Sequence, residues 1–118
     1  MIDYYTQIVA ALNQTLPTYH ELFLSSAADT PCYSVQEYGN RDTAYGDTLG
    51  YSSVSYQVKT WAADLAALET YALSADEAMR RLGFHRTQCN ELSYENLLCK
   101  MCVYEAQGFE IYYQTEPL

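Results

Sequence analysis

Basic residues are scarce in this sequence. Lysine and arginine number 6 against 15 aspartates and glutamates, which gives a formal charge of −9 at neutral pH. A protein that holds nucleic acid by its backbone needs clustered cations to neutralise phosphates, and here Arg80, Arg81 and Arg86 are the ones close in sequence. Arg80 and Arg81 fall where a helix is predicted to end, and cations there suit the helix dipole. The charge therefore argues against a general DNA- or RNA-binding face.

Long apolar runs and common catalytic motifs are missing as well. No stretch approaches the roughly 18 apolar residues of a membrane span, and the first residues lack the basic start and apolar core of a secretion signal. Neither G-x-x-x-x-G-K-S/T nor G-x-G-x-x-G occurs, so nothing supports a nucleotide-binding enzyme. His20 and His85 lie far apart, and no serine or cysteine carries a local catalytic signature. We expect a protein that is not an enzyme, is made in the cytoplasm, and uses no cofactor and no membrane.

Four cysteines are the remaining candidates for metal or thiol chemistry: Cys32, Cys89, Cys99 and Cys102. Cys99 and Cys102 have the C-x-x-C spacing of zinc ligands and redox motifs. Their segment is predicted to be a strand, where positions three apart point to opposite faces, so the two sulfurs are not expected to meet at one metal ion. All four are interpreted as reduced, mostly buried thiols, and no metal site is predicted. A small thiol- or metal-dependent protein that uses Cys99 and Cys102 is the alternative from a different class.

What the sequence does contain is enough apolar material for one folded domain, residues 1–118. Hydrophobic residues make up 49% of the chain and charged residues 18%, which is the range of globular proteins. Apolar residues recur every three or four positions in 2–14 and in 64–83, which predicts two helices. Asp64 is a suitable cap for the start of the longer helix, and Gly83 is suited to its end.

Extended segments are predicted between and after these helices. Residues 51–61 alternate clearly, with Val54, Tyr56 and Val58 on one face. The other candidates are 18–24, 32–38, 84–92 and 97–106, the last two joined by a turn at 93–96. The predicted core comprises Val54, Tyr56, Val58, Leu65, Leu68, Met79, Leu82, Met101 and Val103, with Cys99 on the same face as the last two. The pattern predicts an α+β fold of two layers, in which a mixed or antiparallel sheet of about four or five strands packs on one long helix, with a short N-terminal helix added.

Two segments fit no element of that sheet. Residues 39–50 carry three glycines together with asparagine and aspartates, a composition typical of turns, and are predicted to form a long loop. Residues 108–118 show no clear periodicity, yet they are too apolar for an idle tail. The tail is expected to pack either on its own domain or on another protein.

The 13 tyrosines of the chain fit protein interfaces, and they equally fit the exposed faces of strands.

The order of these elements resembles that of the small tail-completion or tail-terminator proteins of long-tailed bacteriophages. The resemblance is carried by residues 51–62 (YSSVSYQVKTWA), 64–84 (DLAALETYALSADEAMRRLGF) and 99–106 (CKMCVYEA), with Arg86, Glu91, Asn96 and residues 32–38. It spans about 75 of the 118 residues as a pattern of elements and not as a diagnostic motif. It supplies no catalytic residue.

The resemblance implies a virion structural protein that forms a homo-oligomeric ring, commonly a hexamer, which caps the tail tube and joins it to the head-neck complex. The implied partners are the tail tube protein and neck or connector proteins, with DNA passing through the lumen without specific binding. An acidic chain is consistent with such a passage. A neighbouring neck or head-completion protein with a similar domain is the close alternative.

The loop at 39–50 and the tail at 108–118 then serve as arms toward neighbouring subunits. The predicted interface residues are Arg41, Asp42, Tyr45, Asp47, Phe109, Ile111, Tyr112 and Tyr113.

Overall fold

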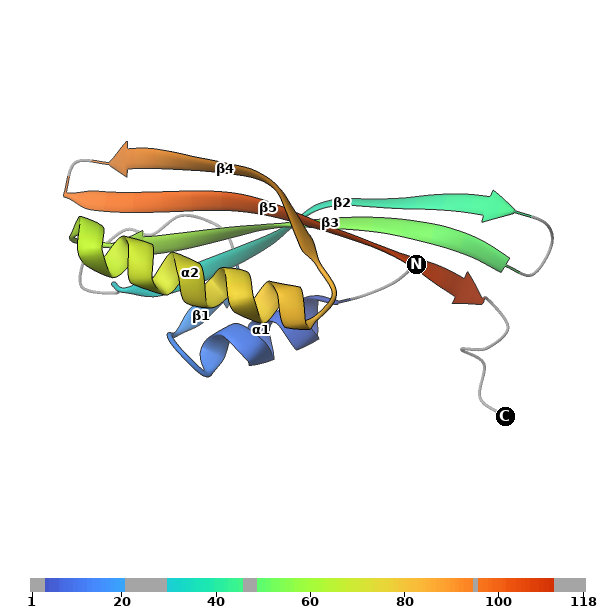
Figure 1. Cartoon of the computed structure of the whole chain (residues 1–118), viewed down its shortest axis with the longest axis horizontal. Helices are drawn as coiled ribbons and strands as arrows, with labels where there is room; N and C mark the ends of the chain where they lie inside the picture. The colour runs from blue at the N-terminus through green and yellow to red at the C-terminus, as the bar shows by residue number, and fades with distance from the viewer. Residues whose placement is uncertain (1–3, 21–29, 46–48, 95, 112–118) are drawn as a thin grey trace.

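The computed structural model of this chain describes residues 4–20, 30–45, 49–94 and 96–111, and for 40–45, 49–52, 94 and 107–111 it describes the backbone (Figure 1). Its elements are α1 (Tyr5–Asn13), β1 (Thr18–His20), β2 (Cys32–Tyr45), β3 (Leu49–Ala62), α2 (Leu65–Arg81), β4 (His85–Tyr94) and β5 (Leu97–Ile111). The predicted α+β class is confirmed. Among the residues described, no helix is long and apolar enough to cross a membrane.

The sheet has five strands in the order β1-β2-β3-β5-β4. The short strand β1 runs parallel to β2, while β2 with β3, β3 with β5 and β5 with β4 are antiparallel. Both helices pack on one face of the sheet, near one end (Figure 1). We call this helix-covered part the body.

The main core lies between this face of the sheet and the two helices. Val54, Tyr56 and Val58 of β3 are each no more than 2% exposed, as the alternation predicts. Their register partners on β5 are Ala106, Tyr104 and Cys102, which belong to the same cluster as Ile8 and Met79 from the helices. The predicted core face of β3 is therefore confirmed.

A second cluster lies on the opposite face of the sheet. It comprises Cys32, Trp61, Leu97 and Cys99, with Leu92 packed against it. Trp61 pairs with Cys32 on one side and with Cys99 on the other, and its Nε1 donates a hydrogen bond of 2.9 Å to Ser34 Oγ. The segment of β5 that holds the C-x-x-C spacing thus contributes to both clusters, Cys99 to this one and Cys102 to the main core.

The bounds of the long helix are those that the sequence predicts. The side chain of Asp64 accepts a hydrogen bond of 2.8 Å from the backbone N–H of Ala67, which satisfies one of the free amides of the first turn. At the other end Gly83 has φ +95°, a conformation that glycine adopts without steric cost. Arg80 and Arg81 occupy the last turn, as expected.

Three residues of the predicted core are placed differently. Leu65 is 57% exposed, because side chains on a helix point back toward its N-terminus and Leu65 is the first helical residue. Leu82 and Met101 are half-buried. Val103 is buried at 4% exposure, but Cys102 and Tyr104 are the residues of this segment that join the helix-side core.

The predicted loop at 39–50 is wrong in its extent. β2 continues to Tyr45 and β3 begins at Leu49, so most of this segment is paired strand. The predicted C-terminal tail also begins too early, because β5 continues to Ile111 and pairs with β3. Together residues 39–45, 49–55 and 105–111 form a three-stranded ribbon, which we call the β arm.

The β arm projects past both helices (Figure 1). Its base coincides with a register irregularity between Glu37 and Gly39 in β2 and with the start of β4, where His85 pairs with Glu105. Six steps of about 3.4 Å give the arm a length of about 20 Å. The molecule accordingly measures 52 × 27 × 23 Å along its principal axes.

Candidate functional site

The β arm gathers the described part of the predicted interface. Arg41, Asp42 and Tyr45 lie on β2, while Phe109 and Ile111 lie on β5. Asp47, Tyr112 and Tyr113 fall outside the described residues. The described parts of the two predicted arms therefore belong to one structure, although they come from distant parts of the chain.

The strand register places these residues at corresponding positions along the arm. Tyr45 pairs with Leu49 of β3, and Leu49 pairs in turn with Ile111. Phe109 is likewise two strands away from Thr43 through Tyr51. At the base, Tyr38 is 62% exposed.

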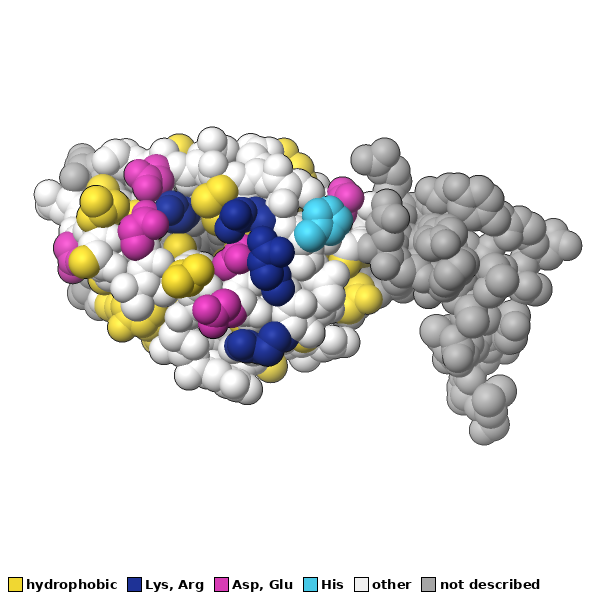
Figure 2. Space-filling view, viewed as in Figure 1, with side chains coloured by type: hydrophobic (Ala, Val, Ile, Leu, Met, Phe, Trp, Pro, Cys, Tyr) yellow, Lys and Arg dark blue, Asp and Glu magenta, His cyan; other side chains and the backbone are white. Residues whose placement is uncertain are grey.

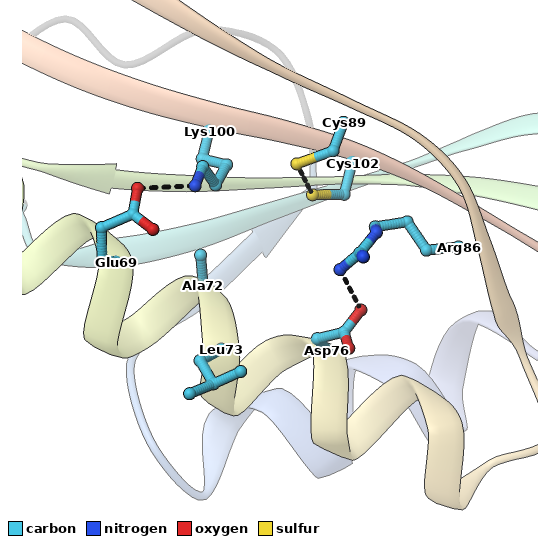
Figure 3. Close-up of a pocket in the computed structure, with 8 residues that line it drawn as sticks. All are labelled: Glu69, Ala72, Leu73, Asp76, Arg86, Cys89, Lys100 and Cys102. Carbon is cyan, nitrogen blue, oxygen red and sulfur yellow. Dashed lines mark hydrogen bonds and ion pairs between the residues drawn. The ribbon is translucent and has the colours of Figure 1, made fainter.

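A second candidate site is a cavity of about 120 Å³ in the body, between α2 and strands β4 and β5 (Figure 3). It is lined by Glu69, Ala72, Leu73, Asp76, Arg86, Cys89, Lys100 and Cys102. Figure 2 shows basic and acidic side chains interleaved around a hollow on this face of the body. Its charged groups fall into two clusters, one at each end of the hollow.

Asp76 is the centre of the first cluster. Its Oδ2 accepts a hydrogen bond of 2.8 Å from Arg80 Nε, and its Oδ1 accepts bonds from Arg86 Nη1 at 3.0 Å and from the Tyr104 hydroxyl at 2.9 Å. Burial raises the pKa of Asp76, but the bonds from Arg80 and Tyr104 and the charges of both arginines outweigh it, so the pKa is lowered. Asp76 thus remains a buried carboxylate that ties α2 to β4 and β5.

Lys100 is the centre of the second cluster. Its Nζ donates to Glu69 Oε1 at 2.5 Å and lies 3.6 Å from Glu91 Oε1. The hydrogen bond lowers the pKa of Glu69 and raises that of Lys100. Each cation lining the cavity is therefore matched by a carboxylate.

Two thiols face each other at the cavity wall. Cys89 of β4 and Cys102 of β5 are register partners, and their Sγ atoms are 2.7 Å apart, within hydrogen-bonding distance (Figure 3). Both are free thiols, Cys89 exposed and Cys102 buried. Burial, followed by the hydrogen bond and the charge of Cys89, raises the pKa of Cys102 to about 12, so this thiol keeps its proton at neutral pH.

A third hollow, of about 240 Å³, lies near the start of the chain and is lined by Tyr5, His20, Glu37 and Tyr56. His20 lies against Tyr5 with ring centroids 5.7 Å apart. Within the described ranges, no three histidine, cysteine or acidic side chains are grouped as metal ligands.

Sequence reasoning missed both the Asp76 cluster and the Cys89–Cys102 pair. Nothing local distinguishes Asp76 from the other acids of its helix, because its partners Arg86 and Tyr104 come from two other strands. The thiol pair did leave a signal. The predicted connection of 84–92 with 97–106 brings these two segments together as a hairpin, and the register that sets Tyr94 opposite Leu97 also sets Cys89 opposite Cys102.

No protein-family model and no curated protein sequence matches the chain.

Proposed function

We propose that this chain is a virion structural subunit of the tail-terminator kind. Copies of it assemble into a ring, a hexamer in the arrangement that the resemblance implies, which caps the tail tube of a long-tailed bacteriophage and joins it to the head-neck complex. The observation that carries the assembly role is the β arm, a ribbon about 20 Å long whose strands begin in the core of the body and continue past both helices (Figure 1).

An arm of this kind gains stability from contact with another chain. A thin ribbon of strands is marginally stable in water unless one of its faces packs against another layer. The two helices of this chain cover the sheet in the body, and the ribbon continues past them (Figure 1). The outer strands β2 and β5 pair with β3 on one side. Along their other side, the His85–Glu105 pair at the base is the last one that joins the arm to another strand among the described residues, so backbone groups beyond it are available to a neighbouring chain.

The negative charge of the chain supports a ring through which DNA passes without specific binding. A closed ring multiplies the formal charge of −9 carried by each copy, and an acidic wall repels the phosphates of DNA. The carboxylates that line the body cavity already neutralise Arg86 and Lys100, which leaves little attraction for a phosphate there. DNA can then pass without being held.

The test is the assembly state of the full chain, measured by native mass spectrometry and negative-stain imaging, alone and with a purified tail tube protein. We expect closed rings. A chain that stays monomeric at high concentration, both alone and with the tube protein, contradicts the proposal. Rings that bind a head connector in place of the tail tube would favour the neighbouring neck role.

A shortened arm separates assembly from folding. Asp42 and Ser52 are register partners, so residues 43–51 can be replaced by an Asn-Gly hairpin turn without disturbing the body. We expect this variant to fold and to lose the ring, while Glu77→Ala, on an exposed part of α2, keeps it. Rings of unchanged size from the shortened variant would show that the arm does not make the contact.

A further inference from the structure

The opposed thiols of Cys89 and Cys102 have a backbone placement suited to a covalent bond. Directly opposed residues of an antiparallel pair have Cα atoms about 4.5 to 5.5 Å apart, and disulfides span Cα separations of about 4.4 to 6.8 Å. Cys89 and Cys102 are such a pair, and their sulfurs already contact each other across the ladder. No movement of β4 relative to β5 is required to join them.

The two thiols also differ in access. Cys89 is exposed, on the outermost strand of the sheet, so a reagent in solution can reach its sulfur. Cys102 is 6% exposed and packs in the main core, so it is reached through Cys89. The other two thiols cannot take part, because Cys32 and Cys99 are fully buried in the cluster on the opposite face.

We propose that Cys89 and Cys102 are a reversible thiol-exchange site. The two residues form a disulfide with each other, and the oxidant is a low-molecular-weight disulfide of the glutathione disulfide class. This inference does not depend on the assembly role. A reducing cytosol keeps both thiols free, and the bond forms where the oxidised reagent accumulates.

The exchange takes two balanced steps. Cys89 loses its proton to solvent and its thiolate attacks one sulfur of the reagent, whose S–S bond breaks and releases one glutathione thiolate, which is protonated. The sulfur of Cys102 then attacks that of Cys89, and the proton of Cys102 passes to the second glutathione as it is displaced and leaves as a thiol. Two protein thiols are oxidised to one disulfide, and one glutathione disulfide is reduced to two thiols.

The experiment is incubation of the folded full chain in glutathione buffers of increasing oxidised fraction, followed by acid quenching, intact-mass measurement and tryptic mapping. We expect a loss of mass equal to two hydrogen atoms and a link between peptides 87–100 and 101–118. A wild-type chain that keeps four free thiols in fully oxidised buffer overturns the proposal, and this result needs no variant.

Variants assign the link and the order of the steps. Peptide 87–100 carries both Cys89 and Cys99, so the matched control is Cys99→Ser, which should keep the link. Cys102→Ser should stop at one glutathione adduct on Cys89, and Cys89→Ser should give neither adduct nor link while folded, as checked by circular dichroism. Loss of the link in Cys99→Ser, or an adduct on Cys102 in folded Cys89→Ser, would refute the assignment.

Discussion

Replacement of Asp76 by alanine should destabilise the body by about 2 to 4 kcal/mol. The largest part of this loss comes from Tyr104, whose hydroxyl donates to Asp76 and whose residue is 1% exposed. A buried donor left without its acceptor costs about 1 to 3 kcal/mol. The side chains of Arg80 and Arg86 are 52% and 42% exposed and recover water, so each pair adds at most about 1 kcal/mol.

The assay is urea unfolding followed by far-ultraviolet circular dichroism, with the free energy of unfolding obtained by linear extrapolation. Asp76→Asn keeps an oxygen acceptor for Tyr104 and should lose about 1 kcal/mol. Glu77→Ala removes the same charge from an exposed neighbour on the helix and should stay within about 0.5 kcal/mol of wild type. If Asp76→Ala is no less stable than Glu77→Ala, the cluster does not hold α2 to the sheet as described.

Three further predictions concern the body. The contribution of Asp76 to the free energy of unfolding is complete above the ordinary carboxyl pKa of 3.8, and it falls as the pH drops through the lower pKa that Asp76 has in the folded protein. The difference in the free energy of unfolding between wild type and Asp76→Ala should therefore narrow in acid. A constant difference would contradict the lowered pKa. Leu68→Ala should cost about 2 to 5 kcal/mol in urea unfolding because Leu68 is 1% exposed, whereas Leu65→Ala should cost less than about 0.5 kcal/mol, and equal losses would refute the helix phase. Asp64→Ala should lower the melting temperature through a loss of about 1 kcal/mol, unlike Glu77→Ala.

The body could largely be predicted because its signals are local. The phase of α2 follows from apolar residues within one segment, and its two ends follow from Asp64 and Gly83, whose effects reach a few residues along the chain. Alternation alone placed Val54, Tyr56 and Val58 in the core. In each case the information lies within one element.

The β arm could not be predicted in the same way. Residues 39–50 have the composition of a loop, yet most of them are strand, because β3 runs between β2 and β5 in the arm and bonds to both. Such pairing outweighs intrinsic strand propensity, which spans about 1 kcal/mol per residue. The same pairing extended β5 to Ile111, beyond the point where its sequence pattern fades.

The cavity of the body shows a second limit. Asp76 contacts Arg86 and Tyr104 because α2 packs at one particular position along strands β4 and β5. No short-range sequence pattern determines that position. The Cys89–Cys102 pair depends on one register alone. A firmer assignment of the turn at 93–96 would have been enough to find it.

The placement of Trp61 gives this chain a built-in optical reporter. It is the single tryptophan of the sequence, 4% exposed, and it packs with Cys32 and Cys99 on the face of the sheet away from the helices. Its emission therefore follows the packing of that face, while helical ellipticity follows α1 and α2 on the other. Coincident unfolding curves from the two signals would mean that both faces of the sheet unfold as one cooperative unit. Separate curves would mean that the packing on one face persists after the packing on the other face is lost.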